Sequence, residues 1–147
     1  MKGCRGFTII ELLVVMSIIG LLASMALPRL GMLKQRALVA SMISDLRNLL
    51  TTQEAFLSTH GDYAGGIIPG PEIPGVGGAG SASMLLSDGV QLTVTYRSNA
   101  SQGEGWSATA THPGVNDPNR DECGVFVGHI SFSPNAAVTG PGRIICY

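Results

Sequence analysis

The chain is poor in charged and aromatic residues, and this scarcity excludes several classes of function. Only 13% of its 147 residues are charged and 5% are aromatic, and nine lysines and arginines stand against ten acidic residues. A chain without a basic excess has no electrostatic footprint for nucleic acid, so no nucleic-acid partner is predicted. His60, His112 and His129 lie far apart and outside any His-Glu-x-x-His motif, and no Cys-x-x-Cys pair occurs. We therefore expect neither an enzyme nor a bound metal or other cofactor.

Glycine and proline are abundant but unevenly placed. Most of the 20 glycines and 8 prolines lie beyond residue 60, which predicts loops and short strands there rather than long helices. Residues 61–83 lack periodicity and are expected to form a connecting loop with little regular structure. The Gly-Gly-Ala-Gly stretch at 77–80 is followed by serines without a basic residue, so it does not indicate a phosphate-binding loop. The length predicts one globular domain.

One long apolar run organises the chain. Residues 7–27 contain a single charged side chain, Glu11, and as a helix they would span roughly 30 Å, about the hydrocarbon thickness of a bilayer. Lys2 and Arg5 precede the run. A cleaved secretory signal is one interpretation, since residues 24–26 could serve as its cleavage site. A retained membrane helix is the other, and Glu11 favours it, because a carboxylate inside a membrane segment persists where it has a function and a partner.

The same residues resemble a known family. Gly6-Phe7-Thr8-Ile9-Ile10-Glu11, followed by the apolar run, is similar to the processing site of type IV prepilins and related pseudopilins. The resemblance implies that residues 1–6 are a leader cut after Gly6 by a prepilin peptidase, which then N-methylates Phe7. The family's proline after the apolar run matches Pro28.

The resemblance also implies partners for the processed chain. Copies of the chain would form a homopolymer through the pilus assembly machinery, after a stage in the inner membrane with the carboxy-terminal part outside. Cleavage gives Phe7 a new amine, which would pair with Glu11 of a neighbouring copy. Either charge left unpaired in an apolar medium carries a large desolvation penalty, so the pairing would fix the register of the subunits.

A second helical pattern follows Pro28. Apolar residues recur at steps of three and four, which indicates an amphipathic helix that lays one face on a sheet. These residues are Leu38, Val39, Met42, Ile43, Leu46, Leu49, Leu50, Phe56 and Leu57. Polar residues, Asp45 among them, are assigned to the opposite side. The helix is expected to end near His60 and Gly61, and with the apolar run to form one helix of about 50 residues, kinked at Pro28.

Short alternating stretches predict an antiparallel sheet after residue 90. Period-two alternation is clearest at 90–96, and further strands are expected at 105–111, at 124–128 with 129–132, and, as a strand or an extended tail, at 143–147. Residues 84–86 could form a helical turn or an early strand. The predicted fold class is α+β, with one long amino-terminal helix packed on a small antiparallel sheet. The family fold has the same layout.

The cysteines predict a disulfide once the leader is removed. Cys4 leaves with the leader, and the remaining Cys123 and Cys146 form an even pair in an exported domain. Such a bridge closes a loop of about 24 residues and stabilises the domain by roughly 3 kcal/mol. Two unrelated thiols are the alternative.

Two polar motifs remain. Residues 117–122 contain three carboxylates, which could suggest Ca²⁺, but Arg120 lies among them and an acidic loop is usually only solvated. Residues 99–101, Asn-Ala-Ser, match an N-glycosylation sequon.

The sequence therefore predicts a structural subunit of a type IV pilus-like extracellular filament. Its parts are a leader (1–6), a membrane and filament-core helix (7–27), an amphipathic helix (28–60) and a region of loop, sheet and disulfide-tied carboxy terminus (61–147). A pseudopilin of type II secretion or a minor pilin is the alternative within the family. A membrane-anchored binding domain that never polymerises is the alternative outside it.

Overall fold

The computed structural model describes residues 7–69 and 81–147, without the side chains of 27, 28, 66–69 and 81. The predicted leader, with Gly6 and Cys4, therefore lies outside the described residues. The chain divides into two units, Met1–Lys34 and Gln35–Tyr147. Its elements, in order, are α1 (Ile9–His60), β1 (Gly66–Pro69), β2 (Ser81–Met84), β3 (Gln91–Asn99), β4 (Gly103–Thr111), β5 (Glu122–Val127), the 3₁₀ turn η1 (Ile130–Phe132) and β6 (Ile145–Cys146).

Helix α1 is a single element of 52 residues, as the two consecutive patterns predicted. It ends where expected: Gly61 adopts φ +77°, and its N–H donates to the carbonyl of Leu57 at 2.8 Å. That bond caps one of the last free carbonyls, and glycine is suited to the left-handed conformation it requires. The backbone remains helical at residue 28. The kink at Pro28 stays a prediction.

The described part of the first unit is mostly apolar. Every described side chain of this unit is exposed, including Phe7 at 84% and Met25 at 73%. Among the residues described, α1 is the one helix long and apolar enough to cross a membrane: an 18-residue stretch of it has a mean hydropathy of 2.4, and none of that stretch is buried. A helix that is hydrophobic all round is stable where lipid or other apolar helices surround it.

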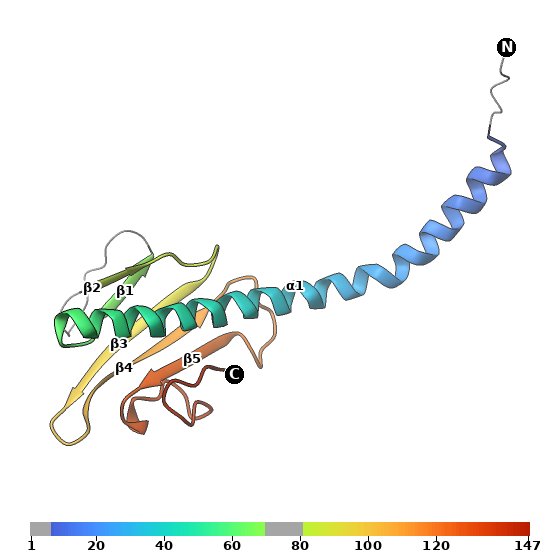
Figure 1. Cartoon of the computed structure of the whole chain (residues 1–147). Coiled ribbons are helices and arrows are strands. Elements are labelled where there is room, and N and C mark those ends of the chain that lie inside the picture. Colours follow the sequence, from blue (N-terminus) through green and yellow to red (C-terminus); the bar gives the residue numbers. More distant parts are fainter. Residues whose placement is uncertain (1–6, 70–80) are drawn as a thin grey trace, which may run out of the picture. The chain divides into compact units, whose positions relative to one another are not determined.

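The second unit has the predicted α+β architecture. Its main sheet has the order β3-β4-β5-β6 with all neighbours antiparallel, and α1 runs along one face of it (Figure 1). The last pairing places Cys123 opposite Cys146, and these two residues form a disulfide. The expected meander, the terminal strand and the cysteine pair are thus confirmed.

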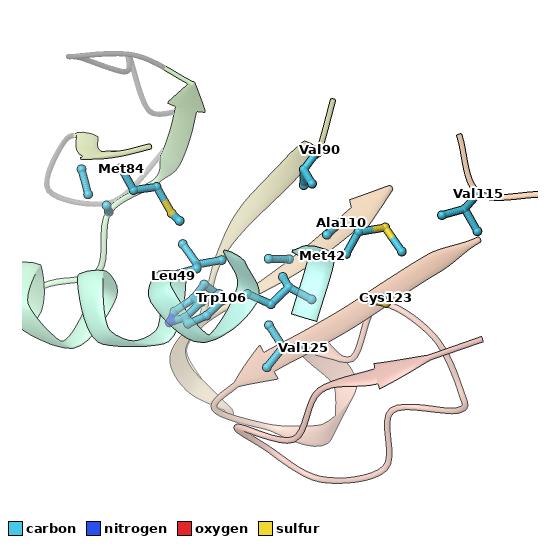
Figure 2. Packing of buried hydrophobic residues seen from close by; sticks show 13 residues of the cluster. Met42, Leu49, Met84, Val90, Trp106, Ala110, Val115, Cys123 and Val125 are labelled. Atoms are coloured by element: carbon cyan, nitrogen blue, oxygen red, sulfur yellow. The ribbon is translucent and has the colours of Figure 1, made fainter. Parts of the chain in front are cut away.

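The core lies between α1 and the sheet (Figure 2). Met42, Leu46 and Leu49 are fully buried on the helix, as its periodicity predicted. They form one cluster with inward-facing residues of β4 and β5, among them Trp106 and Val125, which are also completely buried. Alternate residues of a strand point to one face, so Trp106, Ala108 and Ala110 enter the core together. Their burial is the main source of stability of this unit.

Two sequence predictions were wrong in the connecting segments. Residues 61–83 were expected to lack regular structure, but they contain β1 and the first three residues of β2, and these two strands pair in parallel. Residues 129–132 were expected to be a strand, but they form η1 instead. Gly128, at φ +103°, turns the chain out of β5, and Phe132 packs so closely that a Cβ at Gly105 would lie 2.8 Å from its ring. The chain therefore folds back over the sheet rather than extending it.

The segment after Gly128, which folds back over the sheet, forms a second and smaller hydrophobic cluster with β5. Phe126 and Phe132 are buried together with Val138, and Ile145 and Tyr147 pack against them. β5 is therefore buried along most of its length, since Cys123 and Val125 belong to the larger core and Phe126 to the smaller cluster. The carboxy-terminal segment supplies a large part of this cover.

Ionisation of Tyr147 is expected to reduce the stability of this cluster at alkaline pH. Burial, followed by the nearby Glu122 charge, raises the pKa of the Tyr147 phenol to about 12. In the unfolded chain the Tyr147 phenol has its ordinary pKa near 10. The protonated phenol therefore contributes fully to stability below pH 10, and this contribution is lost as the pH rises toward 12. We expect the free energy of unfolding of Tyr147→Phe to fall less steeply than that of the wild type between these values. The free energy of unfolding is measured by denaturant unfolding at each pH. An equal decrease with pH in the variant and the wild type would contradict this assignment.

Polar side chains of α1 form hydrogen bonds to the backbone of two loops, one after the helix and one between β4 and β5. Gln35 donates to the Gly114 carbonyl (3.0 Å) and accepts from the Asn116 N–H (2.9 Å). Gln53, fully buried, makes the same two kinds of bond to the backbone of Ala64.

Asp45 was predicted to lie on the polar face of this helix, but it is buried. It is only 2% exposed, and its carboxylate accepts from the Ser87 N–H (2.8 Å) and the Ser87 hydroxyl (3.0 Å). The two bonds compensate its burial, which is why a charged residue is tolerated there.

Asp45→Ala is expected to lower the free energy of unfolding by about 2 kcal/mol, because it leaves the part-buried N–H and hydroxyl of Ser87 without their acceptor. The neighbouring exposed Ser44→Ala should change it by no more than about 0.5 kcal/mol. Denaturant unfolding of the full chain in detergent can be followed by the fluorescence of Trp106, the single tryptophan. Equal stabilities of the two variants would show that the bonds to Ser87 contribute nothing.

Candidate assembly site at the start of the long helix

The first turn of α1 is closed by a reciprocal pair of side chains. The Thr8 N–H donates to Glu11 Oε2 at 2.9 Å, and the Thr8 hydroxyl donates to the same oxygen at 2.8 Å. In return, the Glu11 N–H donates to Thr8 Oγ1 at 3.3 Å. Thr8 is therefore the N-cap residue and Glu11 the third helical residue, which is the arrangement of a capping box.

This cap fixes the position of the only carboxylate in the apolar run. Both Thr8 groups bond Oε2, and no described residue donates a hydrogen bond to Oε1. The next charged side chain along the helix is Arg29, roughly 27 Å further on at 1.5 Å per residue. The Glu11 charge is thus held in place at the end of the helix but has no cation within reach on its own helix.

Apolar side chains surround this carboxylate along the chain. Phe7, Ile9 and Ile10 are exposed by 84%, 81% and 70%. In lipid or against other apolar helices these side chains would exclude water from the carboxylate, and an ion without water needs a charged partner. In such surroundings a cation from outside this helix would compensate the buried charge.

Thr8 is the residue that the sequence interpretation missed. The signal was present, because Thr8-x-x-Glu11 just before an apolar run has the spacing of a capping box. The family motif directed attention to Phe7 and Glu11. The structure adds that Thr8 holds the glutamate.

Among the other residues singled out from the sequence, the cysteines 123 and 146 and the three histidines belong to the second unit. Cys123 and Cys146 are joined in the second unit, and Gly6 is outside the described residues. The His60 ring stacks on Phe56 at 4.0 Å, whereas His112 bonds the backbone of Asp88 and Gly114. Those parts of the chain that the structure describes contain no group of three or more metal-ligating side chains.

The amino-terminal segment matches a known family model. Residues 1–27 match the model described as the prokaryotic N-terminal methylation motif. Two kinds of curated relative extend the likeness. The type IV major pilin protein PilA of Myxococcus xanthus (strain DK1622) is 38% identical over 60 residues, which is 41% of this chain and 27% of that protein. A fimbrial protein of Pseudomonas aeruginosa is 26% identical over 144 residues, which is 92% of each chain.

The chain resembles type IV pilins. The likeness lies in the motif, in the names of its relatives and in the fold, which is one long amino-terminal helix packed on a small antiparallel sheet. No solved structure matches the chain. The pilin-like features thus converge on the amino-terminal end, where the methylation motif, the apolar helix and the capped Glu11 coincide.

Proposed function

We propose that this pilin-like chain is the structural subunit of a type IV pilus-like extracellular filament and does not turn over a substrate. The observation that carries the proposal is the conjunction of a methylation motif with an apolar run, residues 7–27, whose single acid is held at the first turn of α1. A helix of this composition is unstable in water, so it needs the bilayer before assembly and other copies of itself afterwards. Head-to-tail contacts whose rotation does not close would generate an open filament.

Processing would create a cationic partner for Glu11. A prepilin peptidase would cut after Gly6 on the cytoplasmic side, where Lys2 and Arg5 keep the leader, and would methylate the new amine of Phe7. The Phe7–Thr8 peptide bond survives this cut, so the Thr8 N–H continues to cap Glu11. The amine of an incoming subunit would then pair with the carboxylate of its predecessor through the free oxygen Oε1. Every stagger that leaves the two charges apart would be penalised by desolvation.

The second unit would form the exposed coat of the filament. Its core is complete without a partner, since Met42, Leu46, Leu49 and Trp106 are already fully buried. The exported side of the membrane is oxidising, which suits the Cys123–Cys146 bridge.

Mass spectrometry and electron microscopy test this function together. We expect sheared surface filaments to contain this chain, with a mature protein that begins at Phe7 and carries one added methyl group. A mature protein beginning at Leu27 would indicate an ordinary signal peptide and would overturn the proposal. Filaments without this chain, alongside a correctly processed membrane form, would indicate an anchored protein that does not polymerise.

A further inference from the structure

The turn between β3 and β4 carries the Asn-Ala-Ser sequon at residues 99–101, which has no part in the proposed assembly. Asn99, Ala100 and Ser101 are all exposed, and the Gln102 N–H donates to the Asn99 carbonyl at 3.1 Å to close the turn. A Cβ placed on Gly103 meets no atom within 4 Å, so the space beside the turn is open. The Asn-x-Ser spacing here matches an acceptor for N-linked glycosylation.

The side chains of this motif hold one another in a defined arrangement. Asn99 Oδ1 accepts from the Ser101 N–H at 3.1 Å and from the Ser101 hydroxyl at 3.0 Å. These bonds anchor the carboxamide by its oxygen, and no described residue bonds its nitrogen Nδ2. The turn is itself held, because the Gln102 side chain accepts from the Ser131 hydroxyl at 2.7 Å. The nitrogen that would carry a sugar is therefore the free end of a fixed group.

We propose that Asn99 is an N-glycosylation site whose carboxamide is presented by Ser101. In this step Asn99 Nδ2 forms a bond to the anomeric carbon of a sugar activated as a glycosyl diphosphate. The bond from that carbon to the phosphate oxygen breaks, and the diphosphate leaves with the electron pair. One proton of the amide passes to a base of the transferase. The product carries its sugar on the tip of the hairpin, where solvent accommodates it.

The chain contains a matched internal control. Asn135 is exposed, and its Oδ1 accepts from the Ala137 N–H at 2.9 Å in the same kind of turn. Residue 137 is alanine, so this second turn has the backbone geometry without the hydroxyl. If the hydroxyl is what matters, Asn99 is modified and Asn135 is not. If an exposed asparagine turn were sufficient, both would be modified.

The experiment uses the native protein from its producing organism. Trypsin places Asn99 in the peptide 98–120 and Asn135 in the peptide 121–143, after reduction of the disulfide. We expect a sugar mass on the first peptide and none on the second. Asn99→Gln and Ser101→Ala should lose it, and Ser101→Thr should retain it. An unmodified first peptide, or a sugar that persists in Asn99→Gln because it is attached to Ser101, would overturn the proposal.

A second experiment distinguishes the sources of the activated sugar. The purified full chain in detergent is incubated with a nucleotide diphosphate hexose and the soluble fraction of the cells, or with a polyprenyl diphosphate glycan and their membranes. Transfer to Asn99 in either mixture supports the site and identifies the donor. Transfer to Asn99 and Asn135 alike would contradict the role of Ser101.

Discussion

Replacing Glu11 with glutamine is expected to reduce the yield of filaments at least about tenfold, which corresponds to about 1.4 kcal/mol in the assembly equilibrium. Glutamine at this position keeps the capping box, because its carbonyl oxygen can accept from the Thr8 N–H as Glu11 Oε2 does. The substitution therefore removes the charge while preserving the start of α1. Without the charge, the amine of the incoming subunit enters an apolar environment unpaired, and its desolvation is not compensated.

Three variants separate the charge of Glu11 from its role in the cap. Glu11→Gln tests the charge, Thr8→Ala removes the N-cap side chain but keeps the carboxylate, and Glu11→Ala removes both functions of residue 11. We expect filament yields to fall strongly in the two Glu11 variants and only modestly in Thr8→Ala, since losing a cap costs about 1 kcal/mol. Membrane insertion and leader cleavage, followed by intact mass, should be unchanged. Normal filament yield from Glu11→Gln would show that the charge does not set the register.

Removal of the Cys123–Cys146 disulfide is expected to lower the free energy of unfolding of the second unit by about 3 kcal/mol. The bridge joins residues 23 positions apart, and the chain-entropy model gives this magnitude for such a loop. β6 comprises only two residues, so without the bridge the carboxy-terminal segment is held by its packing on the Phe126 cluster and by backbone bonds such as that from the Gly142 N–H to the Phe126 carbonyl. Its release would also expose Phe126 and Val138, which are fully buried beneath it.

The fluorescence of Trp106 reports this loss in the full chain in detergent. We expect the double variant Cys123→Ala/Cys146→Ala to unfold on the order of 10 °C lower than the wild type. The reduced wild type should match the double variant, because both lack the same cross-link. A double variant as stable as the oxidised wild type would mean that the packing of Phe126, Phe132 and Val138 suffices to hold the segment.

Local patterns predicted the parts of the fold that depend on neighbours in sequence. The three- and four-residue spacing of Met42, Leu46 and Leu49 placed the core face of α1, and Gly61 marked its end. The alternation of residues 90–96 located β3, although the strand extends further, to Asn99. The even cysteine pair predicted the disulfide.

Contacts between distant residues account for what the sequence did not reveal. Asp45 looked like a solvated residue because its partner, Ser87, lies 42 positions away. The segment at 129–132 looked like a strand because its composition suits one, but Gly128 redirects it and Phe132 finds space over Gly105. At the candidate site Glu11 was identified from the motif, whereas Thr8 required attention to the spacing between them.

The hydrogen bonds that attach α1 to the loops of the second unit do not depend on the side chains of those loops. Gln35 and Gln53 bond only peptide groups, those of Gly114, Asn116 and Ala64, and each such group is present whatever side chain the position carries. At the exposed position among them, Asn116, substitutions that alter charge or shape can therefore accumulate while the bond to α1 is kept. Changes at the two glutamines themselves would not be tolerated in the same way.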